Sequence, residues 1–243
     1  GIFSRTDYQH QAAAYVDVDT YEARAEVARR LSPRGALSAG YAFRRGEYGS
    51  GGPSEEHRLI IGAEYSPALS RTRRAIFRVE NTPTRFSGPL QTTNETVTEN
   101  VNAQRTLLSG EVSVSYPFRP NWRSTARYRR DTQYLSVLRE PTFADAARIE
   151  LSGLLSRRVD LDLSAGYATA ASVLNESAQN LETYTGQVSI RYALKRSIAV
   201  YSEYLYYYYH QRGQDLFVRG LPAVFEQHGV RAGVALFIEP LGR

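Results

Sequence analysis

The feature that most constrains this chain is an alternation of apolar and polar residues that recurs about a dozen times along it. In one example, Ser109, Glu111, Ser113 and Ser115 each follow an apolar residue or glycine. A period of two residues indicates β-strands with one polar and one apolar face. Because so many consecutive segments share this pattern, we expect the sheet to close. With polar residues inside and apolar residues outside, the resulting barrel would lie in a membrane.

The alternation predicts about twelve strands in one closed antiparallel transmembrane β-barrel that spans residues 1–243. Short periplasmic turns should alternate with longer extracellular loops, and an even strand number puts both termini on the periplasmic side. Tight connections are expected near 32–35, 66–72, 117–121, 157–158 and 195–196. Longer ones are expected at 49–55, 86–97, 137–142, 173–179 and 212–223, and 16–19 would be an unusually short outer loop. The predicted strands are 4–16, 20–31, 36–48, 56–66, 73–85, 98–117, 121–136, 143–156, 159–172, 180–194, 197–211 and 224–238.

Composition agrees with a single barrel and excludes a helical membrane protein. The chain has 243 residues and no cysteine, so neither a disulfide framework nor thiolate chemistry is expected. No segment approaches the roughly 18–20 apolar residues of a transmembrane helix, and the mean hydropathy is −0.43. The sequence also lacks methionine, and we expect that the initiator was lost by signal-peptide cleavage or by trimming.

The net charge of +5 comes almost entirely from arginine, because Lys195 is the only lysine. A GC-rich genome would explain this usage, and so would a need for guanidinium groups that bind carboxylates and phosphates. The arginines are spread over one face of many strands and mixed with Glu and Asp. Since they form no basic patch, we expect no nucleic-acid partner.

Each predicted strand carries four or five apolar residues on its outward face, enough for roughly a 25 Å apolar band. Tyrosine and tryptophan border these series and indicate aromatic girdles, and the run 204–209 would belong to the outer girdle. The alternative is a soluble β-sandwich, but strands of this length are unusual there. The outward candidates are Leu37, Ala39, Tyr41, Phe43, Leu59, Ile61, Ala63, Tyr65, Ile149, Leu151, Gly153, Leu155, Val188, Ile190, Tyr192, Val230, Ala232, Val234 and Leu236.

The inward face carries the charged residues that would line a pore. Arginine exceeds acid near the predicted strands 73–85, 98–117 and 121–136, which would favour anions. In the alternative, the inward charges pair with one another and close the lumen. The candidate pore-lining residues are Arg44, Arg58, Arg74, Arg78, Arg105, Glu111, Arg123, Arg127, Arg129, Asp131, Arg148, Glu150, Arg191, Glu203 and Arg231.

Signs of enzymatic chemistry are weak. The four histidines (His10, His57, His210 and His228) are not at metal-ligand spacing, and His228 is predicted to face lipid. No Gly-x-Ser-x-Gly motif is present. We therefore expect no catalytic residues, metal site or cofactor. An outer-membrane hydrolase would require Ser or Asp beside a rim histidine, which the sequence does not show.

Residues 231–238 resemble the C-terminal assembly signal of bacterial outer-membrane proteins, with Arg231, Gly233 and apolar residues two positions apart. Unlike that signal, the chain continues for five more residues. More widely, the chain resembles the β-barrel porins found beside exopolysaccharide biosynthesis genes in Gram-negative bacteria. The segment 31–49 shows the sequence pattern of these porins, and residues 161–167 repeat part of it. The resemblance implies passage of an anionic or neutral polysaccharide across the outer membrane, with a periplasmic protein as partner.

The sequence thus predicts an outer-membrane pore or secretion channel with an arginine-rich lumen that passes anionic solutes or exopolysaccharide. Its partners would be outer-membrane lipids, the solute and a periplasmic or envelope protein. The alternative is a closed barrel that serves as a structural anchor or scaffold in an envelope assembly. These two functions differ in whether the inward charges pair off completely.

Overall fold

The computed structural model describes residues 2–6, 18–48, 52–94, 97–134, 141–173, 180–195, 197–212 and 222–236. Within these ranges the chain forms strands joined by turns and short connections. No helix in them has both the length and the apolar character needed to cross a membrane.

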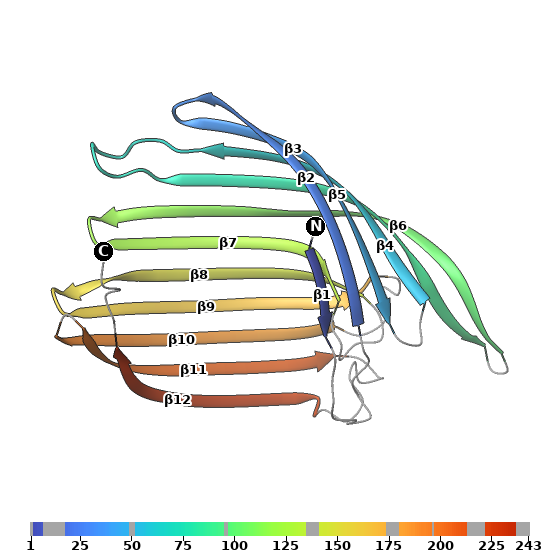
Figure 1. Cartoon of the computed structure of the whole chain (residues 1–243). Coiled ribbons are helices and arrows are strands. Elements are labelled where there is room, and N and C mark those ends of the chain that lie inside the picture. Colours follow the sequence, from blue (N-terminus) through green and yellow to red (C-terminus); the bar gives the residue numbers. More distant parts are fainter. Residues whose placement is uncertain are drawn as a thin grey trace, which may run out of the picture.

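The strands form one curved antiparallel sheet in which each strand pairs with its neighbours in the sequence (Figure 1). This up-and-down order follows from tight turns such as the two-residue ones at 33–34, 120–121 and 157–158, which agree with the sequence prediction. The twelve strands are β1 (Ile2–Thr6), β2 (Val18–Ser32), β3 (Gly35–Tyr48), β4 (Gly52–Tyr65), β5 (Ile76–Asn94), β6 (Val97–Arg119), β7 (Trp122–Gln133), β8 (Thr142–Ser156), β9 (Val159–Ser172), β10 (Asn180–Lys195), β11 (Ile198–Arg212) and β12 (Val224–Leu236).

The pairing register gathers residues of one kind on one face of the sheet. Glu22 lies opposite Arg44, and Arg44 lies opposite Glu56. The Arg58 guanidinium of β4 lies 2.9 Å from the Asp131 carboxylate of β7, three strands away. Only side chains on the concave face can meet over that span. The concave face is therefore the polar one, and a slip of one residue in any pair would reverse the arrangement.

The convex face carries the apolar residues predicted to point outward. Leu59 and Ile61 are more than half exposed, whereas Ile60 between them is 1% exposed. The same face of β12 exposes Val230, Val234 and Leu236 to 78%, 63% and 69%. So much exposed apolar surface indicates contact with an apolar environment.

Two rows of aromatic side chains border the apolar band on the convex face. On the side of the longer connections, the register aligns Tyr128 with Tyr167, Tyr184 and Tyr208. The rings of Tyr167 and Tyr184 are 4.9 Å apart. On the side of the tight turns, the row contains Tyr65, Phe77, Tyr116, Phe118 and Trp122, with ring contacts at 6.5 Å (Tyr65–Phe77) and 6.0 Å (Phe118–Trp122).

Rows of this kind are typical of membrane proteins, in which amphipathic rings favour the headgroup level of the bilayer. On β4, the eight residue steps from His57 to Tyr65 extend about 26 Å along the strand. His57 and His228 both face the convex side, where each ring nitrogen Nδ1 is 2.6 Å from a tyrosine hydroxyl (Tyr41 and Tyr204). His228 was predicted to lie on the outward, apolar face of the sheet, and its position on the convex face confirms this.

The tyrosine-rich run of β11 divides between the two faces, which corrects its assignment to the outer girdle. Tyr204 and Tyr208 lie on the convex side with Val230 and Tyr184 opposite them, respectively. Tyr209 lies on the concave side and is 8% exposed. Strand geometry requires this division, because successive side chains point to opposite faces whatever their chemistry.

Several predicted boundaries were wrong, most clearly the loop expected at 86–97. β5 continues to Asn94 and pairs with β6 down to Asn94 opposite Val97. This hairpin extends beyond the neighbouring strands (Figure 1). Pro89 suggested a loop, but pairing between β4 and β5 stops at Ser87. Pro89 therefore lies beyond β4, where its missing N–H breaks no ladder.

Other boundaries moved by a few residues. β4 begins at Gly52, inside the loop predicted at 49–55, because the pairing of β3 and β4 extends to Tyr48 opposite Gly52. β5 begins at Ile76, so Arg74 lies in the connection before it, in a single bridge with Ala68. Most of the predicted strand 4–16 and of the predicted loops 137–142, 173–179 and 212–223 lies outside the described residues, as do residues 237–238.

The described strands do not close the sheet, so the predicted closure into a barrel stays a prediction. Among the described residues, β12 pairs only with β11, and β1 pairs with β2 over five residues, up to Ile2 opposite Glu22. The edges of β12 and of Ala23–Ser32 in β2 thus lack strand partners within the described ranges. Unpaired backbone groups are tolerated in water but costly in hydrocarbon.

Trp122 is the only tryptophan of the chain, and its indole lies directly over the backbone of Gly153. We expect its fluorescence in reconstituted bilayers to be quenched more strongly by lipids brominated near the headgroup than by lipids brominated near the chain ends. Maximal quenching by chain-end bromine, or none by any lipid, would contradict the turn-side aromatic row.

Candidate functional site

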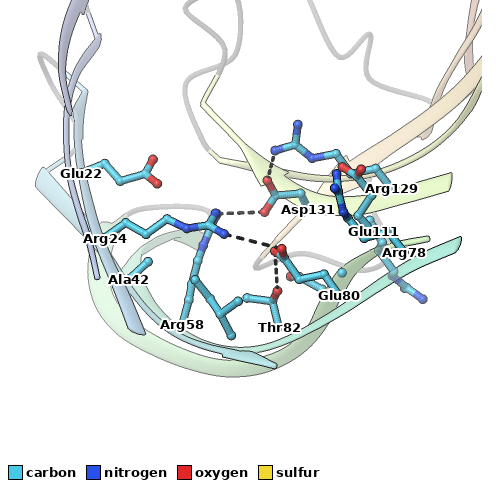
Figure 2. Close-up of a pocket in the computed structure, with 14 residues that line it drawn as sticks. Glu22, Arg24, Ala42, Arg58, Arg78, Glu80, Thr82, Glu111, Arg129 and Asp131 are labelled. Atoms are coloured by element: carbon cyan, nitrogen blue, oxygen red, sulfur yellow. Dashed lines mark hydrogen bonds and ion pairs between the residues drawn. The ribbon is translucent and has the colours of Figure 1, made fainter. Parts of the chain in front are cut away.

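Charged side chains on the concave face of β2–β7 converge around a cavity of about 260 Å³ (Figure 2). We call these side chains the arginine–carboxylate network. Strand alternation brings them to this face, and the strong curvature of the sheet lets residues from non-adjacent strands meet. The network consists of Glu22, Arg24, Arg44, Glu56, Arg58, Glu80, Arg129 and Asp131.

Arg58 is the centre of the network. Its Nε and Nη2 lie 2.9 and 2.6 Å from Glu56 Oε2, and Nη2 is also 2.9 Å from Asp131 Oδ1. Asp131 Oδ2 accepts a hydrogen bond of 2.5 Å from Arg129. Glu56 is fully buried and Arg58 is 8% exposed. One guanidinium thus connects two carboxylates from strands that are three positions apart.

Arg44 makes a second bridge across the concavity. It binds Glu22 at 2.9 Å and donates a hydrogen bond of 3.2 Å to the backbone carbonyl of Thr132, at the end of β7. Its guanidinium also lies 6.0 Å from the centre of the Tyr134 ring. That ring approaches the backbone of Gly46 so closely that any Cβ there would lie about 2.3 Å from it. The absence of a side chain at Gly46 therefore allows Tyr134 to lean across to β3.

A third connection joins β2 to β5. Arg24 binds Glu26 at 2.6 Å and reaches Glu80 at 3.5 Å. The Thr82 hydroxyl also donates to Glu80, at 3.5 Å. Figure 2 shows Arg24 and Arg58 pointing from one wall toward the acids of the opposite wall. These contacts join strands that share no backbone hydrogen bonds.

A small apolar cluster adjoins the network on the side of the longer connections. Phe86 and Val173 have no exposed surface, and Leu107 packs with them, next to Tyr134 and Phe143. Arg105 donates a hydrogen bond of 2.7 Å to the Val173 carbonyl, linking β6 to the end of β9. The concavity of β2–β7 is thus bridged by ionic contacts at mid-height and by apolar contacts near one mouth.

The other predicted pore-lining residues lie on the concave face of the strands, but most are paired locally. Arg78 binds Glu64 at 2.6 Å, Arg127 binds Glu111 at 3.3 Å, and Arg148 binds Glu150 at 2.7 Å. Arg231 binds Glu203, with Nε at 2.8 Å from Oε2. Arg123 and Arg191 form no ion pair with any described residue, and both are exposed. Arg74 is the exception, since it lies outside the strands.

Arginines and carboxylates on the concave face are therefore close to balanced, and the most buried arginines are neutralised. Arg58 and the Arg44 side chain are 8% and 17% exposed and face carboxylates. Arg127 and Arg129 keep 57% and 54% of their side chains exposed. A solute in the concavity would meet these exposed guanidinium groups rather than those at the centre of the network.

Sequence reasoning missed Glu56 and Tyr134. Glu56 was overlooked because the loop predicted at 49–55 put it at the very end of a strand. The alternation of Glu56 with Arg58, opposite Arg44, was the available signal. Tyr134 follows β7 and acts by crossing to β3, and no local pattern reveals such a contact.

Among the described residues, no group of three or more His, Asp or Glu side chains is arranged to hold a metal ion. His57 and His228 are bonded to tyrosines on the convex face, away from the network. The chemistry of the concave face in these ranges is that of ion pairs and exposed guanidinium groups.

No protein-family model matches the sequence, and the comparison with curated proteins finds no match. Solved structures do match. The copper transporter OprC is 12% identical with a TM-score of 0.60, covering 92% of this chain and 43% of that one. The NanC porin is 11% identical with a TM-score of 0.41 (93% and 96% covered). OmpT, an outer membrane protein of Vibrio cholerae, is 10% identical with a TM-score of 0.39 (97% and 94% covered).

By their names these neighbours are a copper transporter, a porin and an outer membrane protein. The chain spans less than half the length of OprC, whose likeness supports the fold alone. The antiparallel sheet is thus similar to the wall of an outer-membrane barrel. The resemblance to exopolysaccharide-associated porins stays a prediction.

If Arg58 and Asp131 hold the two walls together, Asp131→Asn should lower the free energy of unfolding by about 2 kcal/mol, because it removes one of the two carboxylates that bind the buried Arg58 guanidinium. Urea titration of the protein folded in lipid vesicles, followed by Trp122 fluorescence, measures this. Glu47→Gln is the matched control: it removes a carboxylate that pairs with Arg45 at 2.7 Å, with both side chains 42% exposed. It should cost less than about 1 kcal/mol. Equal effects would contradict a special role for the network.

Proposed function

We propose that the chain forms a closed outer-membrane β-barrel that acts as a pore or secretion channel for anionic solutes, exopolysaccharide among them. The observation that carries the proposal is the reversed polarity of the sheet. Its convex face exposes Leu59, Ile61 and Val230, while its concave face buries Glu56 and Arg58. A water-soluble protein would have these surfaces the other way round.

Closure by β1 and β12 would complete the barrel. Both are edge strands, and in an even-numbered up-and-down sheet they run antiparallel, as pairing requires. A membrane-spanning sheet must satisfy its edges, because hydrocarbon offers no hydrogen-bond partners. A barrel of this size is intermediate between those filled by their own side chains and wide aqueous pores.

The open passage would run beside β8–β12. Cross-strand ion pairs and the Phe86 cluster occupy the concavity of β2–β7, whereas the concave residues of β10 between Leu181 and Ser189 are uncharged, with Thr183, Thr185 and Ser189 among them. The exposed guanidinium groups of Arg127 and Arg129 border this passage. Arg123 and Arg191, which form no ion pair with a described residue, lie nearer the turns, where Asp160 is opposite Arg191 in the register. These positive groups would attract anions.

The second candidate function is a closed barrel that acts as an anchor or scaffold. The observation in its favour is the near-complete pairing of concave charges, with Arg44, Arg58, Arg78, Arg148 and Arg231 all bound to carboxylates. A lumen filled by such pairs needs no solute. Enzymatic activity is not part of either proposal.

Single-channel recording in planar bilayers separates the two functions. A steady conductance from folded, inserted protein supports the channel. No conductance from protein whose folding is verified by heat-dependent gel migration supports the scaffold.

For a channel, Arg127→Gln combined with Arg129→Gln should lower the anion-to-cation permeability ratio at least about twofold, because both side chains are more than half exposed on the concave face. The reversal potential in a salt gradient measures this ratio. Arg29→Gln combined with Arg45→Gln is the control, since both residues lie on the convex face, and it should leave the ratio unchanged. An equal shift in the two double variants would contradict an arginine-lined passage.

A further inference from the structure

Three aromatic rings lie together on the concave face at the loop-side end of β11 and β12. The ring centres of Tyr209 and Phe225 are 5.5 Å apart in a stacked arrangement, and Tyr207 contacts them at 6.1 and 6.4 Å. Tyr207 and Phe225 each remain 37% exposed, although Tyr209 is nearly buried. We call Tyr207, Tyr209 and Phe225 the inner aromatic surface.

The inner aromatic surface is separate from the structural contacts described above. The Phe86, Leu107 and Val173 cluster uses none of its three residues. It also lies on the opposite face from Tyr206 and Tyr208, which strand alternation puts on the convex, apolar side. Exposed rings on a polar, water-facing wall add nothing to the ion-pair network and indicate a contact with a ligand.

Neutral hydrogen-bonding groups surround Tyr207. In the register, Gln227 of β12 lies opposite it on one side and Thr185 of β10 on the other. Both side chains are exposed, and neither has a hydrogen-bond partner among the described residues. The amide and the hydroxyl therefore remain available on either side of an exposed ring.

Among the described residues, the concave charges that β11 and β12 carry below this surface neutralise each other. Glu203 accepts hydrogen bonds from Arg231 and, at 2.6 Å, from the Gln187 amide. The described part of this wall therefore presents rings, amides and hydroxyls with no uncompensated charge. It contrasts with the exposed arginines of β7, and it complements an uncharged ligand that carries both apolar faces and hydroxyl groups.

We propose that the inner aromatic surface is a saccharide-binding site within the passage. A pyranose ring has apolar C–H faces that can lie against Tyr207 and Phe225, while its equatorial hydroxyls reach Gln227 and Thr185. Apolar walls with a few oriented polar groups are the usual composition of small-molecule sites. The inference rests on the proposed channel function and assigns a substrate class to one part of its wall.

A saccharide site explains both why Tyr207 and Phe225 are exposed on a polar wall and why Phe225 packs against Tyr209. Ring faces give contact with little loss of side-chain freedom, and a ring stacked on its neighbour is held ready for a ligand. The mutual packing of Tyr209 and Phe225 orients Phe225 in this way. Because the contact is with one or two sugar rings only, binding should be weak enough to permit release and onward movement.

The test is titration calorimetry of the full chain in detergent micelles with maltohexaose as the probe. The wild-type protein should bind it, and Tyr207→Leu combined with Phe225→Leu should weaken binding about tenfold by removing ring contacts while keeping apolar volume. The matched control is Tyr206→Leu combined with Tyr208→Leu, the same change on the convex face of β11. It should bind as the wild type does.

Binding that is equal in the two double variants, or absent from the wild type with maltohexaose, would overturn the saccharide site. Gln227→Ala keeps the rings and should also weaken binding, which provides a second variant if the double variant fails to fold. Calorimetry needs no conductance, so failure of the channel is separate from failure of this site. Conductance without saccharide binding would leave the channel standing and reject the site.

Discussion

The contact between Arg58 and the carboxylates of Glu56 and Asp131 is the interaction on which the shape of the tighter half of the sheet depends. Backbone hydrogen bonds join only neighbouring strands and do not determine how strongly the sheet curves. A guanidinium that reaches from β4 to β7 opposes flattening of the sheet at this point. Because all three groups are buried or nearly so, separation would leave charges without partners in a poorly solvated place.

That arrangement gives the two halves of the concave face different properties. In β2–β7 arginines and carboxylates pair across the concavity, and the Phe86 cluster adjoins them on the side of the longer connections. In β8–β12 the wall is mostly small, neutral or aromatic. Its charges include the pairs Arg231–Glu203 and Arg148–Glu150, with Asp160, Asp162 and Arg191 nearer the tight turns. A solute in the concavity would therefore contact mainly the wall of β8–β12, which carries fewer charges, and the exposed arginines of β7 beside it.

The sequence allowed the strands and their faces to be predicted, because both follow from a period of two and from local turns. Ile60 and Leu59 illustrate this: neighbours in sequence, they are 1% and 53% exposed.

Contacts that depend on curvature were not predictable. Nothing local to Tyr134 indicates that it crosses to Gly46, and nothing local to Asp131 selects Arg58. The long β5–β6 hairpin was missed because residues 86–97 were expected to form a loop. Pro89 is compatible with the strand because the pairing of β4 with β5 ends before it. Closure of the sheet, too, depends on residues far apart in sequence.

The up-and-down order of the strands also has a consequence for how the molecule folds. Every strand pair joins neighbours in the chain, so each hairpin can form with a small loss of chain entropy, and the sheet can grow one strand at a time. Joining β1 to β12 would instead close a loop of almost the whole chain. Loop entropy makes that step the slowest of the zipping sequence. The cross-strand salt bridges of β2–β7 would by then have curved one wall, which brings the two remaining edges nearer to each other before they meet.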